Sequence, residues 1–227
     1  MKQVSLIFFA TGIAATLLYS CKNGPAQPER QASAAGAEPD TVRMEPVPAE
    51  GAVPYTVTRG AVYWSAKKAI GAAHKGSVAV SSGTLLVNQG RLLGGTIALD
   101  MGSISVSNMD DAGEKSTLES HLKDNDFFEV KKYPQAGFEI TDVMPSNQQA
   151  FNWVVRGNLT IKGKSNPVNI PVNLTIGNGR LEAESATFII DRTKWGLTFR
   201  SGLLGTAKDK IIEDIVPVSL KLSARAK

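Results

Sequence analysis

The sequence is poor in the residues that build metal centres and disulfides. Its 227 residues include one cysteine, Cys21, and two histidines, His74 and His121. One cysteine excludes a disulfide within the chain, and so small a set excludes cysteine-based and histidine-rich metal sites. The chain also lacks a nucleophile elbow, a phosphate-binding glycine loop before a helix and a His-Glu-x-x-His motif. We therefore expect no catalytic residue, metal or cofactor.

The chain carries only a small excess of positive charge. Lys and Arg number 25 against 21 Asp and Glu, for a net charge of +4. That sign would suit nucleic acid or an anionic membrane, but the basic residues are scattered and most have acids nearby. No stretch interleaves basic and aromatic residues as a groove for a phosphate backbone would. A solvated surface without a nucleic-acid partner is therefore the favoured interpretation.

The N-terminal residues have the pattern of an export signal. A short basic start over residues 1–3 precedes an apolar run over residues 4–18, which is too short for a typical bilayer span. The following Leu18-Tyr19-Ser20-Cys21 resembles the lipobox of bacterial lipoproteins, in which the cysteine is lipidated and becomes the mature N-terminus. This predicts a signal peptide over 1–20 and a lipid anchor at Cys21. The alternatives are an ordinary signal peptide cut nearby, or an uncleaved anchor.

The composition changes after Cys21 and again near residue 52. Residues 21–51 are rich in Ala, Pro, Glu, Gln and Gly and have no hydrophobic periodicity, which is typical of an extended, mobile tether. With 42% hydrophobic residues overall, the remaining 52–227 can bury the core of one domain. We expect that domain to stand away from a membrane surface on the tether.

Alternation with period two dominates the domain and predicts antiparallel strands with one apolar face. Unbroken alternation marks strands near 151–161, 168–176 and 216–222, and earlier strands are expected at 55–61, 62–67, 74–80, 83–87 and 91–106. Turn signals at residues 88–90, 162–164 and 177–179 predict hairpins. Gly94-Gly95 inside a strand predicts a bend or bulge. So large a one-faced sheet must close or pack on a second layer, and we expect an eight-stranded barrel.

One stretch, residues 116–138, departs from this pattern. Leu118 and Leu122 fall on one helical face, and Asp110 and Asp111 can cap a helix of about three turns. Four aromatic residues follow, and Pro134 prevents a helix from continuing. We expect this helix and its aromatic residues to cover one end of the barrel, with His121 exposed or capping.

Several separated motifs resemble the YceI-like family of polyisoprenoid-binding proteins. The central ones are His121-Leu122, Asp126-Phe127-Phe128-Glu129-Val130, Tyr133-Pro134 and Phe138. Others in order are Trp64, His74-Lys75-Gly76, Gly94-Gly95, Asp100-Met101-Gly102-Ser103-Ile104, Gly157-Asn158-Leu159-Thr160-Ile161-Lys162-Gly163 and Asp191-Arg192-Thr193-Lys194-Trp195-Gly196. The resemblance spans about residues 53–224. It implies an all-β, extended antiparallel eight-stranded lipocalin-like barrel, with a short helix between central strands and an apolar interior that takes a long isoprenoid chain.

The candidate ligand-binding residues follow from that resemblance and from residue type. They are Trp64, His74, Phe127, Phe128, Phe138, Trp153, Phe188, Arg192 and Trp195. His74 and Arg192 are candidates for the polar head of a ligand, and the tryptophans and Phe138 and Phe188 are placed on strands. For each there is a simpler alternative: a surface histidine, an arginine that fixes a strand end through a carboxylate or Trp195, and aromatic rings in a filled core.

The function expected from the sequence is binding, sequestration or transport of an isoprenoid lipid, such as a quinone or polyprenyl phosphate, in the bacterial cell envelope. The protein would be secreted across the inner membrane and held by its lipid anchor, at the outer membrane. Its partners would be the isoprenoid ligand and that membrane. The alternatives are an envelope enzyme acting on such a lipid through His74 or Arg192, and a structural envelope domain without a ligand.

Overall fold

A computed structural model describes residues 51–202 and 205–227 of the chain. The predicted signal peptide, Cys21 and all but the last residue of the predicted tether lie outside the described residues. The described residues include the β-domain expected over 52–227, except for residues 203–204.

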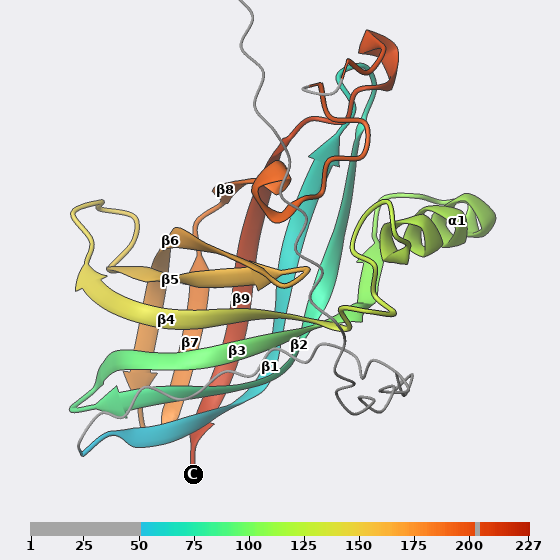
Figure 1. Cartoon of the computed structure of the whole chain (residues 1–227). Helices are drawn as coiled ribbons and strands as arrows, with labels where there is room; N and C mark the ends of the chain where they lie inside the picture. Colours follow the sequence, from blue (N-terminus) through green and yellow to red (C-terminus); the bar gives the residue numbers. More distant parts are fainter. Residues whose placement is uncertain (1–50, 203–204) are drawn as a thin grey trace, which may run out of the picture. The chain divides into compact units, whose positions relative to one another are not determined.

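Eight strand positions close into an antiparallel barrel (Figure 1). The strands are β1 (Val53–Lys67), β2 (Ala73–Asn88), β3 (Arg91–Val106), β4 (Gln135–Pro145), β5 (Trp153–Ile161), β6 (Lys164–Gly177), β7 (Arg180–Ser185), β8 (Phe188–Asp191) and β9 (Ile215–Ala226). Neighbours follow in chain order from β1 to β7, then β9, and β9 pairs with β1 to close the ring. β7 and β8 pair with successive parts of β9, so together they fill one position. The expected eight-stranded barrel is confirmed.

The first two strands are longer than the sequence pattern predicted. β1 and β2 each run unbroken, where four shorter strands were expected. The register shifts between Val57 and Arg59 on β1, and between Val80 and Ser82 on β2. A bulge moves the inward face from odd to even positions, or the reverse, without ending the strand. On β2 the expected break after Val80 coincides with such a change of phase, whereas the expected break after Ala61 on β1 lies beyond the bulge and has no counterpart in the register.

The predicted hairpin turns are confirmed. In each, two residues with positive φ join adjacent strands: Gln89 (49°) with Gly90 (72°), Lys162 (49°) with Gly163 (68°), and Asn178 (50°) with Gly179 (69°). Positive φ at both central positions is the type I′ geometry, whose twist matches that of the flanking strands. These turns set the register of β2–β3, β5–β6 and β6–β7.

The bulge expected at Gly94-Gly95 is also present. The β2–β3 register shifts where Leu86 pairs with Gly94 and Val87 with Leu92. Gly95 has φ +139°, and a Cβ there would lie 2.3 Å from the Thr84 carbonyl oxygen. Only glycine permits this close approach of two strands.

The helix α1 (Ala112–Lys123) lies between β3 and β4 in the chain, as predicted. Asp111 is the N-cap, and its Oδ1 accepts from the Glu114 backbone N–H at 2.8 Å. Glu119 Oε1 accepts from the Val106 N–H at 2.8 Å, which ties the helix to the end of β3. α1 itself has no buried residue and projects beside the barrel in Figure 1. The expected cover therefore comes mainly from the loop after the helix.

The wall between β6 and β8 lacks strand pairing in the described ranges. The Pro171 carbonyl accepts from the Ala186 N–H at 2.8 Å, so Pro171 and every second residue before it present their backbone groups toward β8. Pro167 is one of those residues, and both prolines lack the N–H that a ladder would need. A 3₁₀ helix, η1 (Arg192–Trp195), packs against β6 beyond this point, where Asn166 Nδ2 donates to the Lys194 carbonyl at 3.3 Å.

Candidate functional site

The barrel encloses an apolar cavity of about 170 Å³. The cavity extends from the middle of the barrel to the end at which β3 leads into α1. Aliphatic and aromatic side chains from most strands form its wall, and Arg192 is the one charged residue among the described residues that line it. Inward positions of the strand alternation supply residues such as Val62, Val78, Leu99 and Val218. A wall of this kind suits an uncharged hydrocarbon group.

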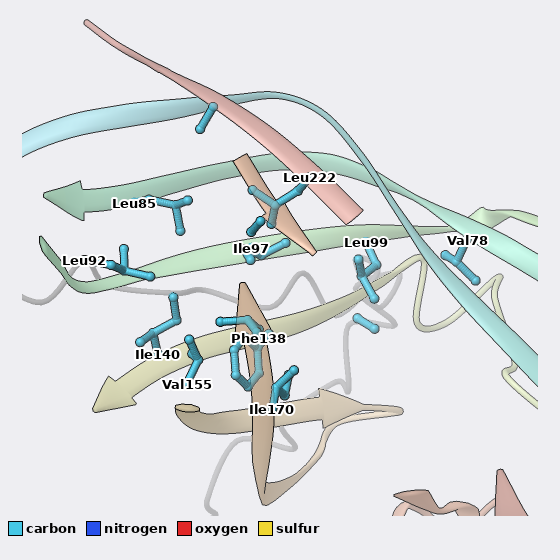
Figure 2. Close-up of a cluster of buried hydrophobic side chains, with 14 of the residues drawn as sticks. Val78, Leu85, Leu92, Ile97, Leu99, Phe138, Ile140, Val155, Ile170 and Leu222 are labelled. Atoms are coloured by element: carbon cyan, nitrogen blue, oxygen red, sulfur yellow. The ribbon is translucent and has the colours of Figure 1, made fainter. Parts of the chain in front are cut away.

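The opposite end of the barrel is filled with side chains. Figure 2 shows part of this core, in which Leu85, Leu92, Ile140, Val155 and Leu222 converge. We call this part, with Val172, Leu174 and Leu181, the filled half, and the part around the cavity the hollow half. A space of only about 30 Å³ remains in the filled half.

The loop after α1 covers the hollow half. Phe127 and Phe128 both line the cavity, together with Leu122 from the last turn of the helix. The Phe128 N–H donates to the Leu122 carbonyl at 3.1 Å, and the Phe127 N–H to the Asp124 carbonyl at 3.0 Å. The chain therefore folds back on the end of the helix, and this return places both rings against the barrel interior.

An aromatic cluster of His121, Phe127 and Phe199 joins this loop to the segment that follows η1. The ring centroids of His121 lie 5.1 Å from those of both phenylalanines, edge to face, and those of Phe127 and Phe199 are 5.2 Å apart. His121 Nε2 also lies 3.0 Å from Asp126 Oδ2. His121 was expected to be exposed or capping; its side chain is 39% exposed, and its ring packs between the rings of Phe127 and Phe199. Phe199 completes the cluster, and the hydrophobic periodicity of the sequence did not identify it as a site residue.

Arg192 is buried and holds the chain that closes the hollow half. Its guanidinium donates to the carbonyls of Glu213 (3.1 Å), Ile212 (2.9 Å) and Leu197, and Nη2 lies 2.9 Å from Asp214 Oδ1. Ser201 Oγ donates to the other Asp214 oxygen at 2.7 Å. Burial lowers the pKa of Arg192, and the Asp214 and Asp191 carboxylates oppose that shift.

This geometry matches the simpler alternative for Arg192, a strand end fixed through a carboxylate. The carboxylate is Asp214, because Asp191 instead caps η1 by accepting from the Thr193 N–H at 3.0 Å. Every guanidinium nitrogen already donates to a protein oxygen. A residue 22 positions away could not be identified as the partner from spacing.

The structure brings six of the nine candidate residues together around the cavity. These are Trp64, Phe127, Phe128, Phe138, Phe188 and Arg192. The other three lie elsewhere. His74 is at the start of β2, Trp153 at the start of β5 stacks under the Arg91 guanidinium, and Trp195 is buried against β5.

Trp64 and Trp195 differ in their polar atoms. Trp195, expected on a strand, lies in η1 and is 2% exposed; its Nε1 donates to the Leu159 carbonyl at 2.8 Å. Trp64 Nε1 is buried with no hydrogen-bond partner among the described residues. Its ring packs flat on Gly76, where a Cβ would lie 2.4 Å from Trp64 Cζ2. Trp64 therefore belongs to the cavity wall and Trp195 to its support.

Other wall residues were not proposed as ligand contacts from the sequence. Leu159, Val168 and Ile190 were part of recognised apolar runs, but the runs alone do not separate a filled core from a hollow one. Leu197 and Ile212 come from the irregular segment before β9 and had no periodic signal.

Over 51–202 and 205–227, no group of three or more His, Cys, Asp or Glu side chains is arranged to hold a metal ion. In the same ranges, no helix is long and apolar enough to cross a membrane.

Sequence comparison finds curated relatives that match part of the chain. UPF0312 proteins of Pseudomonas aeruginosa and Azotobacter vinelandii are 34% and 32% identical to it over 93 residues. The match covers 41% of this chain and 40% of each relative's length.

Structural comparison supports the fold. BcnA of Burkholderia cenocepacia has a TM-score of 0.55 at 20% identity, covering 72% of this chain and 95% of that one. A polyisoprenoid binding domain from Saccharophagus degradans, described as implicated in plant cell wall breakdown, has a TM-score of 0.54 at 14% identity, covering 77% of this chain and 99% of that one. At such identities the likeness establishes the shared barrel alone.

The family model described as YceI-like domain matches residues 55–224, which include α1, the described cavity wall and all but the outermost residues of the barrel strands. The chain therefore belongs to the YceI-like domain family.

Proposed function

We propose that this protein binds the hydrocarbon chain of an isoprenoid lipid in the cavity of its barrel, and stores or carries that lipid in the cell envelope. The observation that carries the proposal is the apolar cavity of about 170 Å³ inside a YceI-like barrel. The description of the Saccharophagus degradans domain as polyisoprenoid binding supports the choice of lipid.

Apolar burial would supply most of the affinity. Each buried methylene contributes about 0.8 kcal/mol, so a few isoprene units suffice for stable binding. Each nitrogen of the Arg192 guanidinium already donates to a protein oxygen, so we do not require it to bind a phosphate. A quinone and a polyprenyl phosphate therefore remain equally compatible with the wall.

Mass spectrometry of the protein purified from its native membrane tests the binding. We expect organic extraction to release an isoprenoid lipid. Val168→Phe adds a ring to the cavity wall and should displace that lipid, whereas Val53→Phe makes the same change at a position that is 45% exposed and should retain it. A wild-type protein that yields no isoprenoid, and binds none when it is supplied, would refute the proposal.

We also propose that the barrel is tethered to the outer membrane through a lipidated Cys21. The lipobox-like Leu18-Tyr19-Ser20-Cys21 and the proline-rich segment after it support this. Because Cys21 is the only cysteine, Cys21→Ser removes every acylation site of that kind. We expect the variant to leave the membrane fraction and to lose incorporation of radiolabelled palmitate. Unchanged fractionation and labelling would contradict the anchor without affecting the binding proposal.

A further inference from the structure

The hollow and filled halves meet at a partition inside the barrel. The cavity of about 170 Å³ and the small space of about 30 Å³ share four wall residues, Ile97, Phe138, Ile170 and Leu220. These four side chains come from β3, β4, β6 and β9, so they reach the barrel axis from different sides. Whatever separates the two spaces must be among them.

Phe138 is the largest of the four, and a glycine on the neighbouring strand makes room for its ring. Its ring lies against Gly157 of β5, where a Cβ would come within 2.4 Å of Phe138 Cζ. Ile97 is its cross-strand partner on β3, so both side chains point inward. Figure 2 shows the ring in the middle of the barrel, beside Ile170. Phe138 is 7% exposed and closes the inner end of the cavity.

The cavity is small for a complete lipid. At about 170 Å³ it is below the roughly 300 Å³ at which ordinary ligand pockets begin, so it holds only a short part of an isoprenoid chain. Beyond Phe138 the filled half leaves almost no free space, and residues such as Leu85 (2% exposed) and Leu181 (0% exposed) block further entry. A chain that enters from the α1 end must stop at the Phe138 ring.

We propose that Phe138 sets the length of isoprenoid chain that the barrel accepts, by closing the cavity at its inner end. This inference rests on the proposed function. With Phe138 in place, the barrel buries only a few isoprene units of a ligand. The rest of the lipid remains toward the α1 end. Removal of the ring should join the two spaces and admit a longer chain.

The test uses geraniol, farnesol and geranylgeraniol, each one isoprene unit longer than the one before. Their affinities for the delipidated protein are measured by displacement of the fluorescent probe N-phenyl-1-naphthylamine. For the wild type, affinity should rise with length and then level off. Phe138→Ala should move that limit by at least one unit, seen as about tenfold or greater tightening for the first alcohol beyond the wild-type limit.

Phe128→Ala is the matched control, because it removes the same ring from the same cavity but not from the partition. It should change affinities without moving the limit. Phe138→Leu serves as a second variant if the alanine variant does not fold, since it keeps the partition apolar while it removes the ring. A wild type that binds no prenyl alcohol would refute the proposed function itself. A wild-type limit that stays at the same length in folded Phe138 variants would overturn only the present inference.

Discussion

The two halves of the barrel are built from the same strands but differ in what surrounds them. In the filled half, two-residue turns join β2–β3 and β6–β7, and every neighbouring pair is hydrogen-bonded. In the hollow half, β8 replaces β7 and is not paired with β6, and the irregular segments after β3 and β8 close the end. Because no ladder joins β6 to β8 in the described ranges, other contacts must hold the hollow half together.

Arg192→Met removes the hydrogen bonds of the buried guanidinium, and we expect it to have the largest effect on stability. It leaves the Asp214 carboxylate without its cation and three carbonyls without a donor, so the free energy of unfolding should fall by about 3–5 kcal/mol. Urea denaturation monitored by circular dichroism measures this loss. Lys221→Met removes the exposed 2.7 Å pair with Glu184 and should cause no measurable change. Equal effects of the two variants would show that Arg192 does not hold the hollow half together.

Phe127→Ala tests the loop after α1, which covers the hollow half. The ring is 8% exposed and contacts His121 and Phe199, so we expect a loss of about 4 kcal/mol in the free energy of unfolding. Phe128→Ala should cost less, because that ring is only partly buried and already faces the cavity. Thermal unfolding of both variants compares them. A melting temperature of Phe127→Ala equal to that of the wild type would mean that the ring is not buried.

A matched pair of leucines then compares the halves directly. Leu181 is fully buried in the filled half, and Leu99 lines the cavity. Leu181→Ala should lower the free energy of unfolding by about 3 kcal/mol, since close packing leaves a new cavity. Leu99→Ala should cost about 2 kcal/mol or less, because one side of Leu99 has few packing partners to lose. Equal losses in urea denaturation would show that the hollow half is as tightly packed as the filled one.

The same contrast explains how much the sequence could predict. Alternation and turn residues such as Asn178 and Gly179 are local signals, so the barrel, its hairpins and the Asp111 cap were predicted correctly. The wrong strand end after Val80 in β2 coincides with a bulge, which changes the phase of the same signal. Hydrophobic alternation shows which side chains point inward, but it does not show whether they touch across the barrel or leave a cavity.

The closure of the hollow half was predicted least well, because its contacts join distant parts of the chain. Asp214 is 22 residues from Arg192, and the Leu159 carbonyl that binds Trp195 is 36 residues away. Phe127 and Phe128 were placed correctly against the barrel interior, because the aromatic run followed a helix end and needed a core. Phe199, with one aromatic ring in an irregular segment, gave no such indication.

The smallest expected effect separates the two tryptophans of the hollow half. Trp195→Phe removes the 2.8 Å hydrogen bond to the Leu159 carbonyl along with ring volume, so we expect a loss of about 2 kcal/mol in unfolding free energy. Trp64→Phe also removes volume, but it eliminates a buried N–H that has no partner among the described residues. The relief of that unsatisfied donor offsets the lost packing, and the net loss should be about 1 kcal/mol or less. Guanidinium denaturation of both variants resolves a difference of this size. A larger loss for Trp64→Phe than for Trp195→Phe would mean that the cavity wall, rather than its η1 support, carries the stability of the hollow half.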